Sequence, residues 1–144
     1  MIGVIAAVDA AVELFCRQGG GQIVGVSSVA GVRGLAGSSS YSASKAGLTV
    51  YLESVRAETI EEPITVTTIA PGYIDTPMSR DVKSRPFLID VGEGARIVAD
   101  LIERGAGFAT VPRLPWMLIT PLLRVLPASW LTRAAPQRDA ATGP

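Results

Sequence analysis

The sequence predicts an α/β fold in which helices cover both faces of a parallel sheet. Three short apolar runs, bounded by Gly or Pro and rich in β-branched residues, are typical of buried strands: residues 22–27, 64–70 and 108–111. Segments with helical periodicity alternate with them, at residues 2–17, 40–60 and 91–104. Because strand and helix alternate along the chain, we expect parallel strands joined by helical crossovers.

The first predicted helix is amphipathic. Its apolar face carries Val4, Val8, Val12 and Phe15. Its charged face carries Asp9, Glu13 and Arg17. Three consecutive glycines at 19–21 follow, and glycine after a helical pattern predicts the end of the helix.

The C-terminal third is apolar but is interrupted by proline. We expect an α/β unit over residues 1–112, an apolar, Pro-interrupted helical extension over 113–131 and a disordered tail over 132–144. Proline and arginine within 114–131 argue against a transmembrane helix. This segment either contacts a membrane surface or docks on the chain's own fold or on a partner.

Composition excludes several functional classes. Thirteen basic residues balance thirteen acidic ones, so no net charge attracts nucleic acid, and we expect no nucleic-acid partner. The single cysteine, Cys16, cannot form an internal disulfide, and no signal segment opens the chain, which predicts a cytoplasmic protein.

The sequence contains no histidine and no asparagine. A Ser-His-Asp or Cys-His site therefore cannot be built. Because no spacing of carboxylates and cysteine is typical of metal ligands, we expect no metal site. Tyrosine, lysine and carboxylate remain as groups for proton transfer near neutral pH.

Tyr41 and Lys45 are four residues apart on a predicted helix, which places both side chains on one face. An ammonium beside a phenol favours the phenolate, so Tyr41 can serve as a general acid or base. The same face carries Leu48, Leu52 and Val55, which we expect to pack on the sheet. The structural alternative is a Tyr/Lys pair that extends toward solvent at the helix start.

Two strand ends add polar and turn-forming residues. Ser28 ends the first strand, and ligands of open α/β sheets bind beyond the carboxyl ends of strands. Its hydroxyl either holds a substrate oxygen or caps a turn. The second strand ends in the segment 71–77, which parallel pairing brings to the same edge. Asp75 or Thr76, just before Pro77, is also a good helix N-cap.

These residues together resemble the short-chain dehydrogenase/reductase family. Ser28 precedes Tyr41 by thirteen residues, Lys45 follows four later, and Pro71-Gly72-x-Ile74-x-Thr76 comes after the next strand. The resemblance covers roughly residues 1–111. It implies that residues 1–112 are the C-terminal portion of a catalytic domain of this family, with a partial Rossmann-like, doubly wound parallel sheet of about three strands.

The resemblance also implies roles for these residues. Ser28 would orient the carbonyl or hydroxyl of the substrate, and Tyr41 would be the general acid/base. Lys45 would stabilise the phenolate and hold the nicotinamide ribose. The turn of Pro71, Gly72, Ile74 and Thr76 would contact the nicotinamide. The implied reaction is hydride transfer between NAD or NADP and an alcohol or carbonyl substrate.

Two departures from the family pattern bear on cofactor binding. The family's strand and Gly-x-x-x-Gly-x-Gly turn, which bring the cofactor pyrophosphate to a helix N-terminus, are absent, and so is its catalytic asparagine. We therefore expect a truncated form, through a misassigned start or a shortened gene. Its uncovered sheet edge would favour association or poor solubility. The alternative is a non-catalytic remnant or association module without cofactor binding.

Two surfaces suggest partners. The face of the 40–60 helix opposite Tyr41 carries small residues, which predicts a homo-oligomer formed through helices 2–17 and 40–60. Residues 78–90 occupy the position of the family's mobile substrate lid. The apolar stretch at 86–89 favours a small apolar alcohol or carbonyl substrate.

Overall fold

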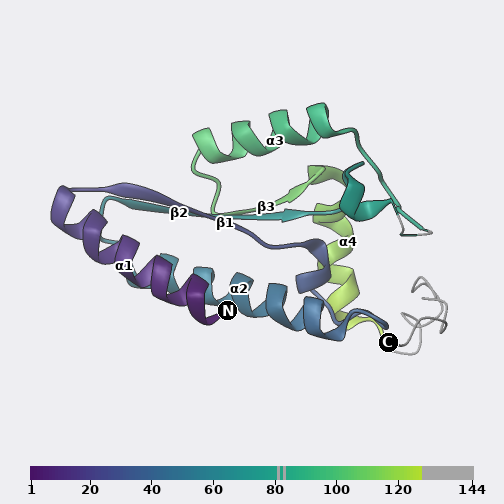
Figure 1. Cartoon of the computed structure of the whole chain (residues 1–144), viewed down its shortest axis with the longest axis horizontal. Coiled ribbons are helices and arrows are strands. Elements are labelled where there is room, and N and C mark those ends of the chain that lie inside the picture. The colour runs from purple at the N-terminus through teal and green to yellow at the C-terminus, as the bar shows by residue number, and fades with distance from the viewer. Residues whose placement is uncertain (81, 83, 128–144) are drawn as a thin grey trace.

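The computed structural model describes residues 1–80, 82 and 84–127 and alternates helices with parallel strands (Figure 1). The elements, in chain order, are α1 (Ile2–Gln18), β1 (Gly21–Val26), the 3-10 turn η1 (Val29–Gly31), α2 (Ser39–Glu58), β2 (Ile64–Pro71), the 3-10 turn η2 (Pro77–Ser79), α3 (Val91–Glu103), β3 (Phe108–Val111) and α4 (Arg113–Val125). The predicted α/β class with about three parallel strands is confirmed. The tail expected at 132–144 and the end of the extension lie outside the described residues.

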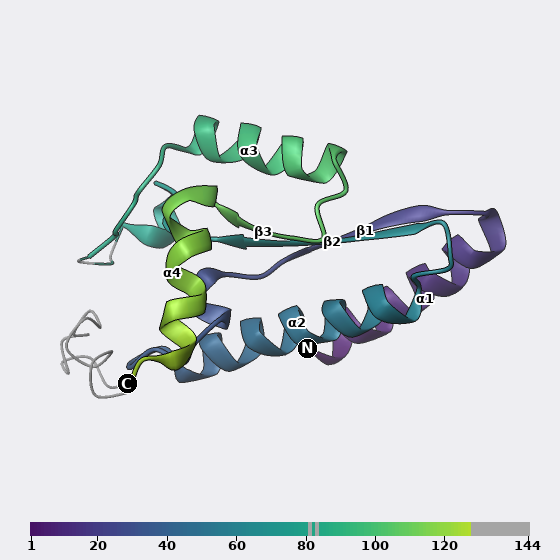
Figure 2. The same ribbon diagram turned by 180° about the vertical axis from the view of Figure 1, so that it is seen from behind.

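The three strands run parallel in the order β1-β2-β3, with Gly21 opposite Ile64 and Thr68 opposite Phe108. Helices α2 and α3 make the two crossovers that parallel neighbours require. Figures 1 and 2 show α1 and α2 on one face of the sheet and α3 on the other. All three strands therefore end at the same edge, where the loops after β1 and β2 begin.

The core lies between α2 and the sheet. The predicted apolar face of α2 is confirmed, because Leu48, Leu52 and Val55 are buried against Ile23 and Val66. Gly25 is the strand residue beneath Leu52, and a Cβ built on it would lie 2.1 Å from Leu52 Cδ1. Glycine at this point lets α2 approach β1 closely.

Helix α1 ends as the glycine run predicted. Gly19 adopts a left-handed conformation with φ 84°, and its N–H donates to the Phe15 carbonyl. Val8 is buried and Phe15 packs on the core, but Val4, predicted on the same face, is 41% exposed. The contacts with the core are therefore made by the middle and C-terminal turns of α1.

The outer strand β1 is only partly covered. Helix α3 packs over β2 and β3, and Val24 and Val26 on β1 remain exposed. Within the part of the chain that the structure describes, β1 has a strand neighbour on one side only. An apolar sheet edge is thus open to solvent, as the sequence predicted.

Helix α4 docks on the chain's own fold. Trp116 is buried beside β3, and the Arg33 guanidinium donates to the carbonyl oxygens of Arg124 and Leu126 at 3.1 and 3.0 Å. The outward side remains apolar, with exposed Leu118 and Leu122. Among the described residues, every helix is too short or too polar to cross a bilayer.

Candidate active site

Ser28 joins the loops that follow β1 and β2. It is nine-tenths buried, lies two residues beyond β1 and forms the N-cap of η1. Its Oγ accepts the Ala30 N–H at 3.1 Å and donates to the Pro71 carbonyl oxygen at 3.4 Å. The two strand ends therefore meet at one edge, and this hydroxyl lies between them.

Lys45 and Tyr41 lie together on the first turns of α2, as the four-residue spacing predicted. The Lys45 ammonium lies 5.8 Å from the centre of the Tyr41 ring, within the range of a cation–π contact. The same ammonium donates to the Val26 carbonyl oxygen at 2.8 Å. Lys45 thus connects the end of β1 to the face of the tyrosine ring, and 45% of Tyr41 remains exposed to a ligand.

Close packing of η1 on α2 sets the position of the Lys45 backbone. A Cβ built on Gly31 would lie 2.8 Å from the Lys45 carbonyl carbon, so the loop after Ser28 can approach the α2 backbone only with glycine there. Ser27, a buried neighbour of Ser28, donates to the Lys45 carbonyl oxygen at 2.9 Å and bonds Thr49 at 2.7 Å. Sequence analysis did not single out Ser27 as a site residue. Its position next to Ser28 is the one feature of the sequence that could have indicated it.

The turn after β2 carries the other predicted site residues. The Gly72 N–H donates to the Val111 carbonyl oxygen at 2.8 Å, which extends the pairing of β2 with β3. Beyond it, Ile74 forms a bridge with Ile89, with Asp75 N–H donating to the Ile89 carbonyl oxygen at 2.9 Å. Ile89 is therefore paired with the turn that follows β2.

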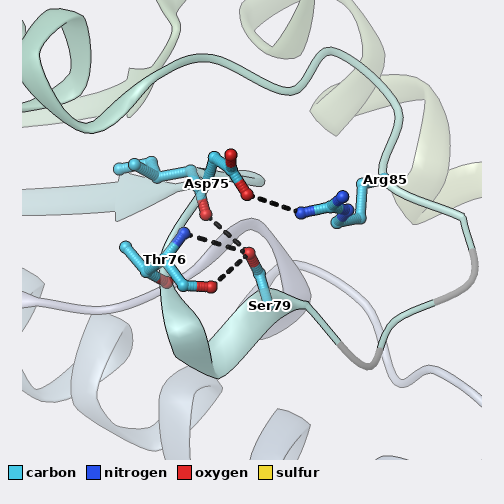
Figure 3. Close-up of polar contacts among 5 residues, drawn as sticks. Asp75, Thr76, Ser79 and Arg85 are labelled. Atoms are coloured by element: carbon cyan, nitrogen blue, oxygen red, sulfur yellow. Dashed lines mark hydrogen bonds and ion pairs between the residues drawn. The ribbon is translucent and has the colours of Figure 1, made fainter.

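Thr76 has the capping role that the sequence allowed. It is the N-cap of η2, and Pro77 occupies the first position of that turn. Figure 3 shows the Ser79 hydroxyl turned back toward it: Ser79 Oγ accepts the Thr76 N–H at 3.3 Å and lies 2.7 Å from the Ile74 carbonyl oxygen, to which it donates. Ile74 and Thr76 thus belong to one hydrogen-bonded turn.

An ion pair closes the same segment. Arg85 Nη1 lies 2.8 Å from Asp75 Oδ1, with the two side chains 27% and 50% exposed (Figure 3). Partly exposed pairs contribute little to stability, about 0–1 kcal/mol. The pair links Arg85 to the residue that precedes Thr76.

Tyr73 is a second phenol at this edge that sequence analysis missed. Burial, and in addition the charge of Tyr41, raise the pKa of Tyr73 above its ordinary value of 10. The two phenols are therefore near enough to interact electrostatically. No pattern in the sequence marks Tyr73, because its nearness to Tyr41 arises only when the two strand ends meet.

The structure thus brings together the end of β1, the start of α2 and the turn after β2. Ser28 contacts Pro71, and Lys45 contacts Tyr41. Among the described residues, no hydrogen bond joins Ser28 directly to Tyr41. A substrate oxygen between them would complete the arrangement.

Lys45 keeps donors that a further ligand could use. The Lys45 ammonium has three donors, and the bond to Val26 uses one, so two remain for ribose hydroxyls. No glycine-rich strand-to-helix turn that would take a pyrophosphate occurs in the sequence. Within the described residues, no group of three or more metal-ligating side chains could hold a metal ion.

The sequence matches one family model and several known proteins. Residues 1–86 match the family model described as short chain dehydrogenase. An uncharacterized oxidoreductase of Mycobacterium tuberculosis (strain ATCC 25618 / H37Rv) is 37% identical over 136 residues, which cover 94% of this chain and 54% of the relative. A 3-oxoacyl-[acyl-carrier-protein] reductase of Homo sapiens is 37% identical over 83 residues, which cover 58% of this chain and 35% of the relative.

The fold is also similar to solved structures. Acetoin dehydrogenase from Enterobacter cloacae superposes with a TM-score of 0.62 at 28% identity, covering 76% of this chain and 49% of that one. The likeness confirms a Rossmann-like sheet flanked by helices. The chain spans about half the length of the curated uncharacterized oxidoreductases that it matches.

Proposed function

Because the chain belongs to the short chain dehydrogenase family, we propose that it takes part in the NAD(P)-dependent interconversion of an alcohol and a ketone or aldehyde. The observation that carries the proposal is the meeting of Ser28, the Tyr41–Lys45 pair and the turn after β2 at one edge of the sheet. The cofactor supplies or accepts the hydride. The chain supplies the groups that hold and protonate the substrate oxygen.

In the reducing direction, Tyr41 donates its phenolic proton to the carbonyl oxygen as the carbon accepts hydride. The Lys45 ammonium, fixed on Val26, stabilises the phenolate that remains. Ser28 replaces its long hydrogen bond to Pro71 with one to the same substrate oxygen. In the oxidising direction the proton returns to Tyr41 from the alcohol.

Lys45 and the turn of Pro71, Gly72, Ile74 and Thr76 would hold the ribose and nicotinamide. Support comes from the free donors of Lys45 and from the hydrogen bonds that Gly72 N–H and the Ser79 hydroxyl make within and beside the turn. Exposed Met78 and Leu88 near that turn favour a small apolar substrate. We leave the choice of NAD or NADP open, because the family sets it in the segment that this chain does not match.

One observation favours a second function. The chain covers about half of its relatives and leaves Val24 and Val26 exposed beside an open strand edge. An association module that binds no cofactor would have the same features. In either case we propose self-association through α1 and α2, where exposed small residues lie beside Val50.

The test uses the purified chain with NADH or NADPH and a panel of small ketones. We expect cofactor binding, and turnover that falls at least 100-fold in Tyr41→Phe. Tyr51→Phe is the matched control, because it removes a phenol from the same helix away from the site. Absence of cofactor binding in the wild-type chain would instead support the association module, and equal turnover in Tyr41→Phe would exclude the proposed acid.

A further inference from the structure

Trp116 packs on the turn that follows β2. It is 6% exposed, and a Cβ built on Gly72 would lie 2.3 Å from Trp116 Nε1 and 2.7 Å from Cε2. The edge of the indole therefore lies directly on the Gly72 backbone, and only glycine fits beneath it. Helix α4 reaches this position because it begins two residues after β3, which is paired with β2.

Phe87 also packs on the same indole. The two rings are perpendicular, with centroids 5.3 Å apart, a favourable edge-to-face arrangement. Phe87 has φ 58°, a left-handed conformation that bulky residues rarely adopt. Such strain persists only where surrounding contacts impose it, and the contact observed here is with Trp116.

The indole supports a turn that is otherwise weakly attached to Ser28. The bond from Ser28 Oγ to the Pro71 carbonyl oxygen is 3.4 Å long, near the limit for a hydrogen bond. Tyr73, whose pKa is raised by burial and by the charge of Tyr41, follows Gly72 immediately. A shift of the Gly72 backbone would therefore move the turn relative to both Ser28 and Tyr41.

The opposite end of α4 is fixed to the loop after Ser28. The Arg33 guanidinium donates to the carbonyl oxygens of Arg124 and Leu126, at the C-terminal end of the helix. A cation there also interacts favourably with the helix dipole. Helix α4 thus contacts both loops that meet at Ser28 and Pro71.

We propose that Trp116 is a positioning residue of the site: its indole, which packs on Gly72 and on Phe87, fixes the turn after β2 against Ser28 and Tyr41. The inference rests on the proposed function for its effect on catalysis, but the positioning itself does not require activity. The positioning role of Trp116 also gives the apolar helix α4 a role within the fold.

Trp116 could hold the turn by the packing of its ring or by a hydrogen bond from its indole N–H. Trp116 Nε1 is buried and has no hydrogen-bond partner among the described residues. The contacts that the structure gives this ring, with Gly72 and Phe87, are packing contacts. If ring packing is what matters, Trp116→Phe should preserve the position of the turn, and Trp116→Leu should not.

The test reads the turn directly in the full chain without cofactor. Tyrosines labelled with 13C on the ring give signals for Tyr41, Tyr51 and Tyr73, the three tyrosines of the sequence. In Trp116→Leu we expect the Tyr41 and Tyr73 signals to shift and the Tyr51 signal to stay. Leu118→Ala, on the exposed side of the same helix, is the control and should move none of the three.

Two further variants keep the proposal testable if Trp116→Leu does not fold. Phe87→Leu removes the second ring and should shift the same two signals, whereas Trp116→Phe should leave them near their wild-type positions. With an active chain, Trp116→Leu should lower kcat at least tenfold, with a smaller change in KM. Unchanged Tyr41 and Tyr73 signals in folded Trp116→Leu or Phe87→Leu would overturn the positioning role, whether or not the wild type reduces ketones.

Discussion

Ser28 and Pro71, 43 residues apart in the sequence, meet through a hydrogen bond from the serine hydroxyl to the proline carbonyl oxygen. This contact marks the point where the loops of two parallel strands converge. The Tyr41–Lys45 pair lies beside it because Lys45 bonds the last residue of β1.

Ser28→Ala should lower both kcat and the free energy of unfolding, and the two losses can be measured separately. Loss of one preorganised donor to a reacting oxygen costs about 10²–10³ in kcat. Loss of the N-cap bond to Ala30 should cost about 1 kcal/mol in free energy of unfolding. Steady-state kinetics and urea unfolding measure the two effects. Ser54→Ala, which removes an exposed hydroxyl from α2, should leave both unchanged, and an equal loss in kcat there would contradict the role of Ser28.

Lys45→Met should weaken cofactor binding. The methionine keeps much of the apolar stem but removes the ammonium and its two free donors. Hydrogen bonds to charged groups contribute about 1.5–3 kcal/mol each, so Kd for NADPH should rise at least tenfold. Fluorescence titration of NADPH measures it, with the exposed residue Arg96 changed to Met as the control for lost charge. Equal affinity of wild type and Lys45→Met would refute the assignment.

Leu52→Ala should be strongly destabilising. Leu52 is fully buried and packs on the bare backbone of Gly25. Leucine-to-alanine changes in a close-packed core cost about 2–5 kcal/mol. Val50→Ala, two residues earlier and 61% exposed, should change stability by less than about 0.5 kcal/mol. Chemical unfolding of the two variants measures the difference in their free energies of unfolding. Similar losses of stability in both variants would contradict the position of Leu52 in the core.

The contact between α1 and α2 should weaken at high pH. Tyr51 donates to Asp9 Oδ1 at 2.5 Å, and burial followed by this hydrogen bond raises the pKa of Tyr51 from 10 to about 12. A group whose pKa is raised in the folded state stabilises it fully below the unfolded value and loses that effect through the folded value. The stabilisation is therefore complete below pH 10 and lost as pH rises to 12.

Thermal unfolding at several pH values measures this loss. The wild type should exceed Tyr51→Phe in melting temperature below pH 10, and the difference should shrink as pH approaches 12. A difference that stays constant across this range would show that the phenol and Asp9 are not coupled.

Much of the fold follows from local patterns. The β-branched run at 108–111 coincides with β3, and the periodicity at 40–60 gives α2 to within two residues at either end. The buried positions of Leu48 and Leu52 follow because helical spacing alone determines which side chains share a face. Ser28, Tyr41 and Lys45 could be selected because their spacing is itself local.

Other features depend on contacts that sequence spacing does not encode. Tyr73 approaches Tyr41 only through pairing of β1 with β2, and Trp116 reaches Gly72 only through β3. The apolar run around Trp116 has the same composition whether it lies on a membrane or on the chain's own sheet. Val4 fits the amphipathic pattern of α1, yet the core does not extend far enough to cover it.

The bond between Lys45 and Val26 has a thermodynamic consequence for the exposed strand. Val26 is the last residue of β1, so the amine that would hold a ribose is attached to the outermost strand of the sheet. If a nucleotide binds at Lys45 and a second molecule pairs with β1, reciprocity of linked equilibria requires that each changes the affinity of the other by the same factor. Assembly along β1 would then be a second readout of ligand binding at Lys45.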